Sequence, residues 1–240
     1  MTFVSELSSA GISTEAIGGE KSTGIIAGSV HLPLNATVLE VGGGGGLFAI
    51  GLAQALERSV VSIDIDPGML KLAQKNYARI SSRAQVDFRN IDVMSSQVGG
   101  PFDMVAHRGI EIFFQDRSVI TRRMADLVKP LGYLVAITQT YEVAPTSESL
   151  SKINDATGYF ISPTSRAQYI AGYEDVGLHL ISSTELSVEP ARVVGEISDD
   201  LARKIAICNE NDALTRAFLL IFRKGGPGIL LSEAVHEAKA

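Results

Sequence analysis

Apolar positions in the chain follow two alternating patterns from residue 36 onward. Short runs rich in Val, Ile and Leu are typical of buried parallel strands, whereas longer runs with apolar residues three or four positions apart are typical of helices that pack on a sheet. The pattern predicts strands and helices in alternation. The strands are expected at residues 36–41, 59–65, 84–91, 102–107, 132–140, 178–188 and 217–224, and the helices at residues 47–57, 67–80, 117–128 and 163–176.

Local sequence signals mark where some of these elements begin and end. Asp66-Pro67 predicts an N-cap followed by a first helical residue. Ser162-Pro163 predicts the start of a later helix that stops at Gly177. Strands that alternate with helices of this length indicate an α/β fold, with a doubly wound, mostly parallel seven-stranded sheet and helices on both faces.

The chain length suits a single domain over residues 1–240, with a core at about 30–140 and 162–224. Two of the segments outside the alternation leave or return to the carboxyl end of the sheet, so we expect a cap or lid over a second ligand. Loops that only decorate the surface are the alternative. Residues 225–240 are expected to form a loose tail or a short terminal helix. The segments outside the alternation are 1–30, 141–161 and 189–215.

Composition and charge narrow the class of protein. Hydrophobic residues make up 45% of the chain and charged residues 20%, a balance typical of globular proteins. The formal net charge of −6 argues against nucleic-acid partners, which need clustered Lys and Arg. The only cysteine, Cys208, excludes an internal disulfide, and the N-terminus lacks the pattern of a secretory signal. We expect a cytoplasmic protein without a membrane segment, and a homodimer is left open.

Five consecutive glycines follow the first predicted strand, in the stretch from Glu40 to Phe48. Ligands of doubly wound sheets bind beyond the carboxyl ends of the strands, so we expect this turn to approach a ligand closely. Residues 44–49 satisfy the G-x-G-x-x-A pattern of dinucleotide-binding proteins, but a run of five glycines would satisfy many patterns. Glu40 discriminates better, because its carboxylate would repel a pyrophosphate and attract the cationic groups of S-adenosylmethionine.

The stretch Glu40-Val41-Gly42-Gly43-Gly44-Gly45-Gly46 resembles the first motif of the class I S-adenosylmethionine-dependent methyltransferases, an acidic residue followed by G-x-G-x-G. The resemblance implies that Gly42, Gly44 and Gly46 let the backbone approach the methionine part of the methyl donor. Gly43 and Gly45 stand where small or polar residues are commoner in the family, so by this resemblance they need not be glycine.

Later motifs extend the resemblance over about residues 36–140. It implies that Asp64, at the end of the second strand, binds the ribose hydroxyls, because a carboxylate can accept two hydrogen bonds at once. Asp66 is expected to be the helix N-cap instead. Asp92, after the third strand, would accept a hydrogen bond from the adenine amino group, and its alternative is a turn-capping aspartate. The apolar walls expected around the adenine ring are Ile65, Ile91 and Val93.

Methyl transfer is an in-line displacement, so the protein mainly aligns the acceptor and excludes water. A base is needed only where the acceptor must lose a proton. His107, at the end of the fourth strand and beside the expected methyl position, is the first candidate for a general base and for contact with the donor. Its alternative is a histidine hydrogen-bonded to loop backbone. Glu111 and Tyr141 are further catalytic candidates with structural alternatives, and no His or Cys spacing indicates a metal site.

The acceptor class is narrowed by a missing motif. Methyltransferases that act on amino groups of nucleic-acid bases or glutamine usually carry an Asn/Asp-Pro-Pro-aromatic motif after the fourth strand, where this chain has Ala106-His107-Arg108-Gly109. We therefore expect methyl transfer to a small-molecule acceptor under the cap. Two rival hypotheses remain, namely an NAD-dependent oxidoreductase and a non-catalytic protein that binds S-adenosylmethionine.

Overall fold

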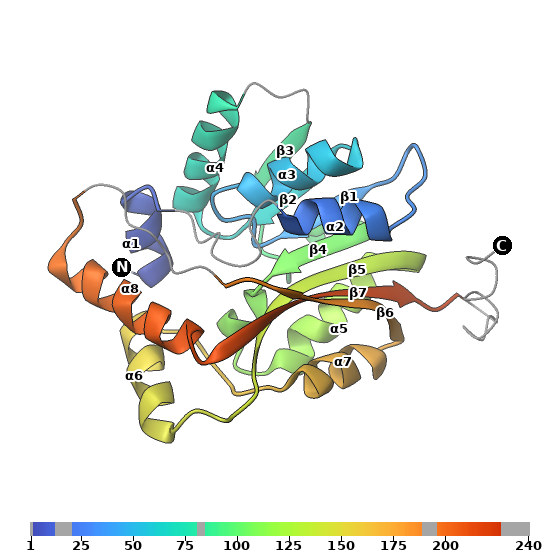
Figure 1. Ribbon diagram of the computed structural model, residues 1–240. Coiled ribbons are helices and arrows are strands. Elements are labelled where there is room, and N and C mark those ends of the chain that lie inside the picture. Colours follow the sequence, from blue (N-terminus) through green and yellow to red (C-terminus); the bar gives the residue numbers. More distant parts are fainter. Residues whose placement is uncertain (1, 13–20, 81–84, 189–195, 227–240) are drawn as a thin grey trace.

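The structure, a computed structural model, describes residues 2–12, 21–80, 85–188 and 196–226. Within these ranges seven strands form one sheet in the order β3-β2-β1-β4-β5-β7-β6 (Figure 1). β7 runs antiparallel to both of its neighbours, and the other adjacent strands are parallel. The prediction of a doubly wound, mostly parallel seven-stranded sheet is confirmed. The strands are β1 (Val38–Val41), β2 (Val60–Asp64), β3 (Val86–Asn90), β4 (Phe102–Arg108), β5 (Val128–Tyr141), β6 (Leu178–Leu186) and β7 (Thr215–Lys224).

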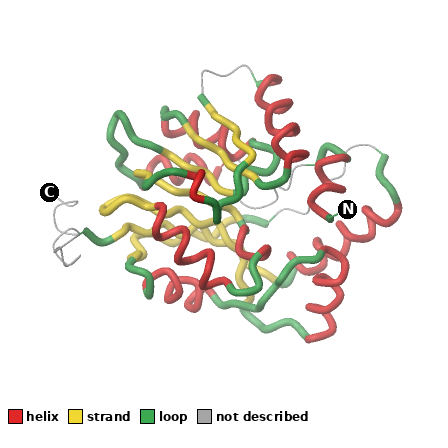
Figure 2. The backbone as a smooth tube through the Cα atoms, turned by 180° about the vertical axis from the view of Figure 1, so that it is seen from behind, coloured by secondary structure: helices red, strands yellow, loops and turns green. Residues whose placement is uncertain are grey.

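Helices cover both faces of the sheet (Figure 1). One face carries α2 (Lys21–Ser29), α3 (Leu47–Leu56) and α4 (Pro67–Arg79), and the other carries α5 (Arg117–Leu127) and α7 (Arg166–Glu174). Two short 3₁₀ helices, η1 (Ser96–Val98) and η2 (Ile110–Phe113), follow β3 and β4. Beyond one end of the sheet lie α1 (Phe3–Ser9), α6 (Ser147–Thr157) and α8 (Asp199–Asp212), and the reverse view shows the same grouping (Figure 2).

Successive residues of the central strands point to opposite faces, which divides the core into two layers. In β4, Val105 packs on the face of α5 and α7, whereas Met104 and Ala106 pack on the face of α2 and α3. The last two residues of the strand continue the alternation, with His107 on the α7 face and Arg108 on the α3 face. Side chains at this end of the sheet are thus directed to two different surroundings.

The helices α1, α4 and α8 share a third apolar cluster at the carboxyl ends of the parallel strands. Figure 1 shows the strands β1, β2 and β4 ending toward α1 and α8. The glycine turn after β1 and the helices α1, α6 and α8 therefore stand at the same edge of the sheet. The buried members of the cluster are Phe3, Leu7, Ile12, Met69, Leu72, Leu201 and Ile205.

Two element boundaries differ from the sequence prediction by three residues or more. α7 begins at Arg166 and not at Pro163, because the side chain of Ser165 caps the helix and Gln168 completes a capping box. β5 begins at Val128 and not at residue 132, because Val128 pairs with Phe102 as soon as α5 ends. The N-cap at Asp66 and the helix stop at Gly177, whose φ is +82°, agree with the prediction.

The predicted cap segments divide into different structures. α2, within the segment 1–30, packs its buried Ile26 against the sheet and is part of the core, so the cap prediction is wrong for residues 21–29. α1, α6 and α8 do lie beyond the sheet edge (Figure 1). Parts of the predicted cap at 13–20 and 189–195, and the predicted tail from residue 227, lie outside the described residues.

Candidate functional site

The glycine turn after β1 packs closely on the sheet and on α4. Gly42 and Gly46 have φ of +73° and +81°, left-handed conformations that glycine adopts without strain. A Cβ atom on Gly43 would lie 2.2 Å from Oγ of Ser62, and one on Gly46 would lie 2.7 Å from Cβ of Ala73. A side chain at position 43 would therefore displace the hydroxyl of Ser62 or the carboxylate of Glu40, and the expectation that position 43 need not be glycine stays a prediction.

Glu40 lies at the end of β1, directly beneath this turn. Its side chain is 1% exposed, and Oγ of Ser62 donates a hydrogen bond to its Oε2 at 2.5 Å. A Cβ atom on Gly43 would come within 2.8 Å of the same carboxylate oxygen. The negative charge of this carboxylate would attract a cationic group of a ligand close to the turn.

Asp64 connects the end of β2 to the glycine turn. Its Oδ2 accepts a hydrogen bond from the backbone N–H of Gly44 at 2.8 Å, and its Oδ1 accepts one from the N–H of Asp66 at 2.8 Å. Burial raises the pKa of Asp64, against the lowering effect of these two hydrogen bonds. Each carboxylate oxygen has two lone pairs, so both oxygens keep capacity for the hydroxyls of a ribose. The ribose contact stays a prediction.

Apolar and polar groups stand side by side around the expected adenine position. Ile65 is 67% exposed beyond the end of β2, which is unusual for a large apolar side chain, and Val93 is buried. Ile91, which lies between Ile65 and Val93 in the sequence, is half-buried. Asp92 is exposed and its Oδ1 accepts a hydrogen bond from the N–H of Met94 at 2.9 Å, which is the turn-capping alternative. Its contact with the adenine amino group stays a prediction.

The loop after β4 lies against the glycine turn. Ile110, the first residue of η2, is buried, and its Cγ2 would lie 3.1 Å from a Cβ atom on Gly42. Gly109 before it has a φ of +61°, which turns the chain back from the strand end. Sequence reasoning did not single out Ile110, although its place directly after a glycine at a strand end was a usable signal.

His107 belongs to a buried polar network on the α7 face. Its Nε2 lies 2.8 Å from the hydroxyl of Tyr173, and that hydroxyl donates to Oε1 of Glu111 at 3.3 Å. A hydroxyl has one hydrogen, so Nε2 donates to the tyrosine oxygen and Nδ1 is the unprotonated nitrogen. Nδ1 lies 3.6 Å from Oε1 of Glu111 and has no hydrogen-bond partner among the described residues.

The surroundings keep His107 neutral. The ring is 0% exposed, and burial lowers the pKa of His107, opposed by the nearby Glu111 and reinforced by Arg117. His107 is bonded to the side chain of Tyr173 and not to loop backbone, and sequence reasoning did not single out Tyr173. The roles of His107 and Glu111 in catalysis stay predictions.

Tyr141 ties β5 to the cap. It is 8% exposed, and its hydroxyl donates to Oδ1 of Asn211 in α8 at 2.7 Å. Burial raises the pKa of Tyr141, so the hydroxyl keeps its proton. Next to it, Glu142 pairs with Arg216 at 3.1 Å. The described contact of Tyr141 is structural, and a catalytic role stays a prediction.

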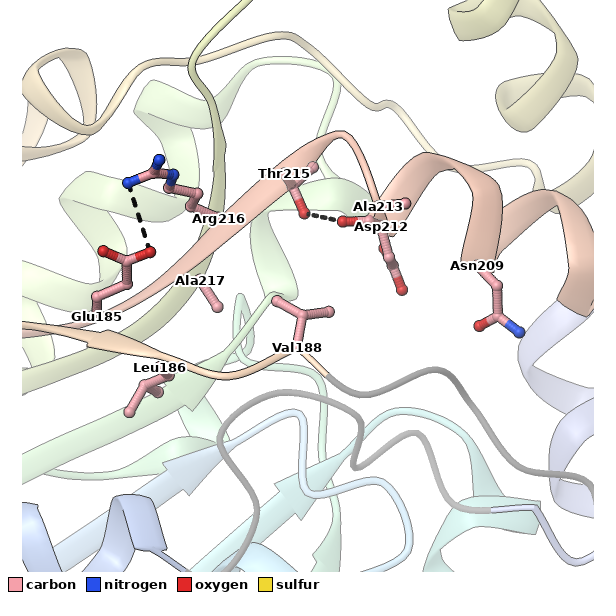
Figure 3. Close-up of a pocket in the computed structure, with 9 residues that line it drawn as sticks. All are labelled: Glu185, Leu186, Val188, Asn209, Asp212, Ala213, Thr215, Arg216 and Ala217. Carbon is pink, nitrogen blue, oxygen red and sulfur yellow. Dashed lines mark hydrogen bonds and ion pairs between the residues drawn. The ribbon is translucent and has the colours of Figure 1, made fainter.

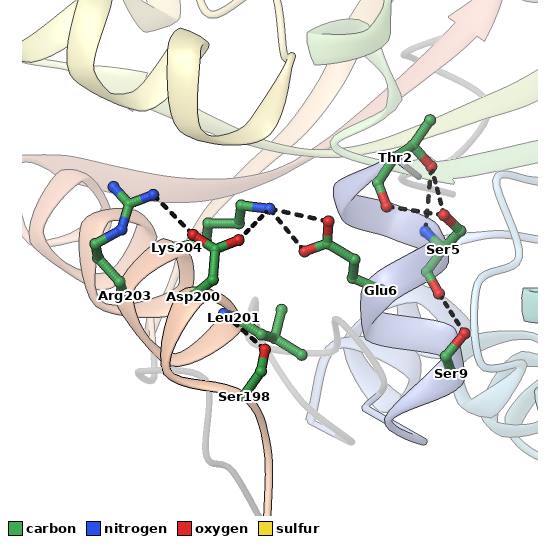
Figure 4. A network of polar contacts seen from close by, with 9 residues as sticks. All are labelled: Thr2, Ser5, Glu6, Ser9, Ser198, Asp200, Leu201, Arg203 and Lys204. Atoms are coloured by element: carbon green, nitrogen blue, oxygen red, sulfur yellow. Dashed lines mark hydrogen bonds and ion pairs between the residues drawn. The ribbon is translucent and has the colours of Figure 1, made fainter.

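A charged latch joins the N-terminal helix to α8 (Figure 4). Nζ of Lys204 lies 2.8 Å from Oε2 of Glu6 in α1 and 2.8 Å from Oδ2 of Asp200 in α8. α1 also approaches α4, since a Cβ atom on Gly68 would lie 2.5 Å from Oγ of Ser8. The short helix α1 therefore bridges the half of the molecule that carries Asp64 and the half that carries α8.

A pocket opens at the carboxyl end of β6 and the amino end of β7, beneath the end of α8 (Figure 3). Its volume is about 360 Å³. The side chains of Asp212 and Asn209 point into it from α8 and Val188 points into it from the segment after β6 (Figure 3). A second hollow of about 520 Å³, between β5, α6 and β7, shares Ala213, Thr215 and Arg216 with the first.

Other kinds of site find no support in the part of the chain that the structure describes. It contains no group of three or more His, Cys, Asp or Glu side chains that could hold a metal ion. None of its helices is long and apolar enough to cross a membrane.

Comparison with known proteins finds a similar domain and similar solved structures. Residues 38–132 match the family model described as a methyltransferase domain. No curated protein matches the chain. Among solved structures, a proposed sarcosine dimethylglycine methyltransferase from Galdieria sulphuraria is similar at a TM-score of 0.66 and 16% identity, over 86% of this chain and 84% of the other.

Two further solved structures share the fold. The [4+2]-cyclase SpnF is similar at a TM-score of 0.66 and 15% identity, over 86% of this chain and 81% of the other. Geranyl diphosphate C-methyltransferase from Streptomyces coelicolor A3(2), solved with Mg²⁺, geranyl diphosphate and S-adenosyl-L-homocysteine, is similar at a TM-score of 0.65 and 13% identity, over 85% of this chain and 77% of the other.

The residues at the turn fit the methyl donor of this family. The backbone at Gly43 and Gly46 is as close to its surroundings as glycine allows, and the buried carboxylate of Glu40 suits a ligand with ammonium and sulfonium groups better than a pyrophosphate. Residues 38–132 thus match a methyltransferase domain, and the solved structures show that the chain shares the fold of these methyltransferases.

Proposed function

We propose that the protein transfers a methyl group from S-adenosylmethionine to a small-molecule acceptor bound beside helices α1, α6 and α8. One observation carries the proposal: the glycine turn over the buried Glu40 and the pocket below α8 lie at the same edge of one sheet, with β4 and β5 between them. A transfer between two bound molecules needs two such spaces close together, with water kept out between them. The apolar cluster of α1, α4 and α8 supports the exclusion of water.

The donor, when bound, supplies an electrophilic methyl carbon. Glu40 would attract its cationic groups, and Gly42, Gly44 and Gly46 would give its methionine part close access to the backbone. Asp64 would accept hydrogen bonds from the ribose hydroxyls, in addition to the two backbone bonds that orient its carboxylate. The residues proposed to surround the adenine are Ile65, Ile91, Asp92 and Val93.

The contacts of His107 support a role as general base, but that role requires a movement of the side chain or of η2. Its unprotonated Nδ1 faces Oε1 of Glu111, and a carboxylate beside a histidine stabilises the imidazolium that forms on proton uptake. The ring is 0% exposed, however, so an acceptor proton reaches Nδ1 only if the side chain turns or η2 moves. Glu111 would then orient His107, and Tyr141 would hold α8 in place. An acceptor whose attacking atom carries no proton needs no general base.

The fold does not identify the acceptor molecule. By their names, the similar structures act on molecules as unlike as sarcosine or dimethylglycine and geranyl diphosphate. The likeness to a [4+2]-cyclase favours a second candidate function, in which the chain binds S-adenosylmethionine without transferring its methyl group. A cytoplasmic location, a homodimer and the absence of nucleic-acid partners stay predictions from the sequence.

Titration calorimetry with S-adenosylhomocysteine and with NAD tests the donor assignment. We expect binding of S-adenosylhomocysteine and none of NAD, and a loss of about tenfold or more in affinity for Glu40→Gln, since about 1.4 kcal/mol corresponds to a factor of ten. Asp87→Asn, which neutralises an exposed carboxylate on β3, is the matched control. Tight binding of NAD without a response to S-adenosylhomocysteine would overturn the proposal.

Transfer itself is tested separately from binding. The protein is incubated with a metabolite extract and a donor labelled in its methyl group, and products are detected by mass difference. Label in a small molecule supports methyl transfer. Binding of S-adenosylhomocysteine without any labelled product across extracts supports the second candidate instead.

A further inference from the structure

The pocket below α8 is held in shape by side chains from β5. Nε2 of Gln139 donates to Oδ1 of Asp212 at 2.9 Å and contacts Oγ1 of Thr215 at 3.0 Å. The hydroxyl of Tyr141 fastens the neighbouring Asn211 at 2.7 Å. These bonds fix the last turn of α8 over the strand ends and direct the carboxylate of Asp212 into the pocket (Figure 3). Its orientation is therefore set before any ligand arrives.

The charge of the pocket and its neighbouring hollow is negative. Asp212 and Glu185 line the pocket, and Glu142 lines the adjoining hollow. Arg216 is the basic residue common to both, and its guanidinium is shared between Glu142 at 3.1 Å and Glu185 at 3.6 Å. Among the described residues, Asp212 takes part in no ion pair, because its side-chain partners are the neutral Gln139 and Asn211.

Part of the remaining lining is apolar. Leu186, Val188 and Ala217 form the part of the pocket that faces the sheet, and Leu186 and Ala217 are buried. A ligand that fits has a small hydrocarbon body and one polar end near Asp212. Burial raises the pKa of Asp212, which reflects the loss of water around its carboxylate, and a positively charged partner would compensate for that loss.

We propose that this pocket recognises acceptors that carry a protonated amino group, with Asp212 as the counter-ion, and that it disfavours acceptors that carry a carboxylate or phosphate. The inference rests on the proposed function, since it names the acceptor class for the same site. It concerns recognition only: the ammonium group orients the molecule and is not assigned as the atom that is methylated. Asn209, beside Asp212 on α8, gives the ammonium a second polar neighbour.

Three probe molecules of similar size test which charge the pocket prefers. Benzylamine, benzyl alcohol and benzoate share a ring and differ in the charge of the polar end, and each is titrated into the full-length protein saturated with S-adenosylhomocysteine at pH 7. We expect benzylamine to bind about tenfold more tightly than the other two, and Asp212→Asn to remove this preference while keeping the hydrogen bond from Gln139. Glu174→Gln, which neutralises an exposed carboxylate on α7, should change nothing.

The outcomes distinguish the inference from the proposed function. Failure of S-adenosylhomocysteine to bind the unaltered protein counts against the proposed function itself. Where S-adenosylhomocysteine binds, equal or tighter binding of benzoate, or no binding of benzylamine, overturns the inference whatever the variant does. A preference for benzylamine that survives in Asp212→Asn also overturns it, provided that this variant binds S-adenosylhomocysteine as the unaltered protein does and is therefore folded.

Discussion

The hydroxyl of Tyr173 in α7 lies 2.8 Å from Nε2 of His107 at the end of β4, and both side chains are buried. The same hydroxyl donates to Oε1 of Glu111 in η2. η2 begins with Ile110, which packs against Gly42 of the glycine turn. A single tyrosine oxygen therefore links the helix layer on one face of the sheet to the loop that borders the proposed donor site.

Tyr173→Phe removes this oxygen and little else. Nε2 of His107 and Oε1 of Glu111 would each lose a partner inside the core, and a buried polar group without a partner costs about 1–3 kcal/mol. We expect the free energy of unfolding, measured with urea, to fall by that amount. Tyr133→Phe in β5 is the control and should have a smaller effect, because its hydroxyl accepts a long hydrogen bond of 3.4 Å from the N–H of His31. Equal effects of the two changes would show that the network contributes nothing to stability.

The lowered pKa of His107 makes stability depend on pH. The unfolded chain takes up a proton near the ordinary histidine pKa of 6.5, whereas the folded protein does not until the pH reaches its lower value. The contribution of the neutral, buried ring is thus fully present above pH 6.5 and is lost as the pH falls below it. The charged and titratable groups around the ring are Glu111, Arg117 and Tyr173.

His107→Gln tests this dependence, because the amide does not titrate. Between pH 7.5 and 5.5 the stability advantage of the unaltered protein over the variant should shrink by about 1 kcal/mol, since one proton corresponds to about 1.4 kcal/mol per pH unit. Urea titrations at three pH values in this range measure it. Taking the difference cancels the titration of other groups, such as Asp64 and Asp212. A constant difference across the range would mean that the ring titrates alike in both states.

Gly43→Ala probes the closeness of the glycine turn to the sheet. The new methyl group would meet Oγ of Ser62 at 2.2 Å and Oε2 of Glu40 at 2.8 Å, so the hydrogen bond between these side chains must break or the turn must lift. We expect a loss of about tenfold or more in affinity for S-adenosylhomocysteine by calorimetry. Gly24→Ala in α2 meets no atom within 4 Å and should keep full affinity. Unchanged affinity in Gly43→Ala would show that the turn tolerates a side chain.

Much of the fold was predictable because apolar periodicity and turn residues act locally. The strand β2 and the N-cap Asp66 follow from runs of neighbouring residues, and both were predicted close to their observed positions. The start of α7 was misplaced because two signals competed, and the capping box of Ser165 with Gln168 overrode Pro163. The packing of α2 on the core was missed because that helix contains no pattern of apolar residues strong enough to separate it from the cap.

The site was predictable only where the sequence itself is unusual. Glu40 before a glycine run and Asp64 at a strand end stand out in the sequence, and both lie at the turn. Tyr173 lies 66 residues from His107, and nothing in the sequence of α7 marks it as a partner. Ser62 gave a weak signal, as a polar residue inside an apolar strand. Contacts of this kind depend on how layers of the fold meet, which one sequence does not specify.

The latch of Lys204 offers a test of how α1 is held over the sheet edge. Lys204→Met keeps the apolar stem that packs between α1 and α8 but removes the charge that joins Glu6 to Asp200. The side chains of Lys204 and Glu6 are only 16% and 19% exposed, so their attraction is less screened than that of a surface pair. We expect amide hydrogen exchange in α1 to become about threefold to tenfold faster, while exchange in β4 stays unchanged, because local opening of a small element responds to the few contacts that hold it.

Arg203→Gln removes the neighbouring, well-exposed pair with Asp200 and leaves α1 untouched, so its exchange profile should match that of the unaltered protein. If Lys204→Met and Arg203→Gln give the same exchange in α1, the apolar cluster of Phe3 and Leu7 with α4 and α8 holds this helix without help from the latch.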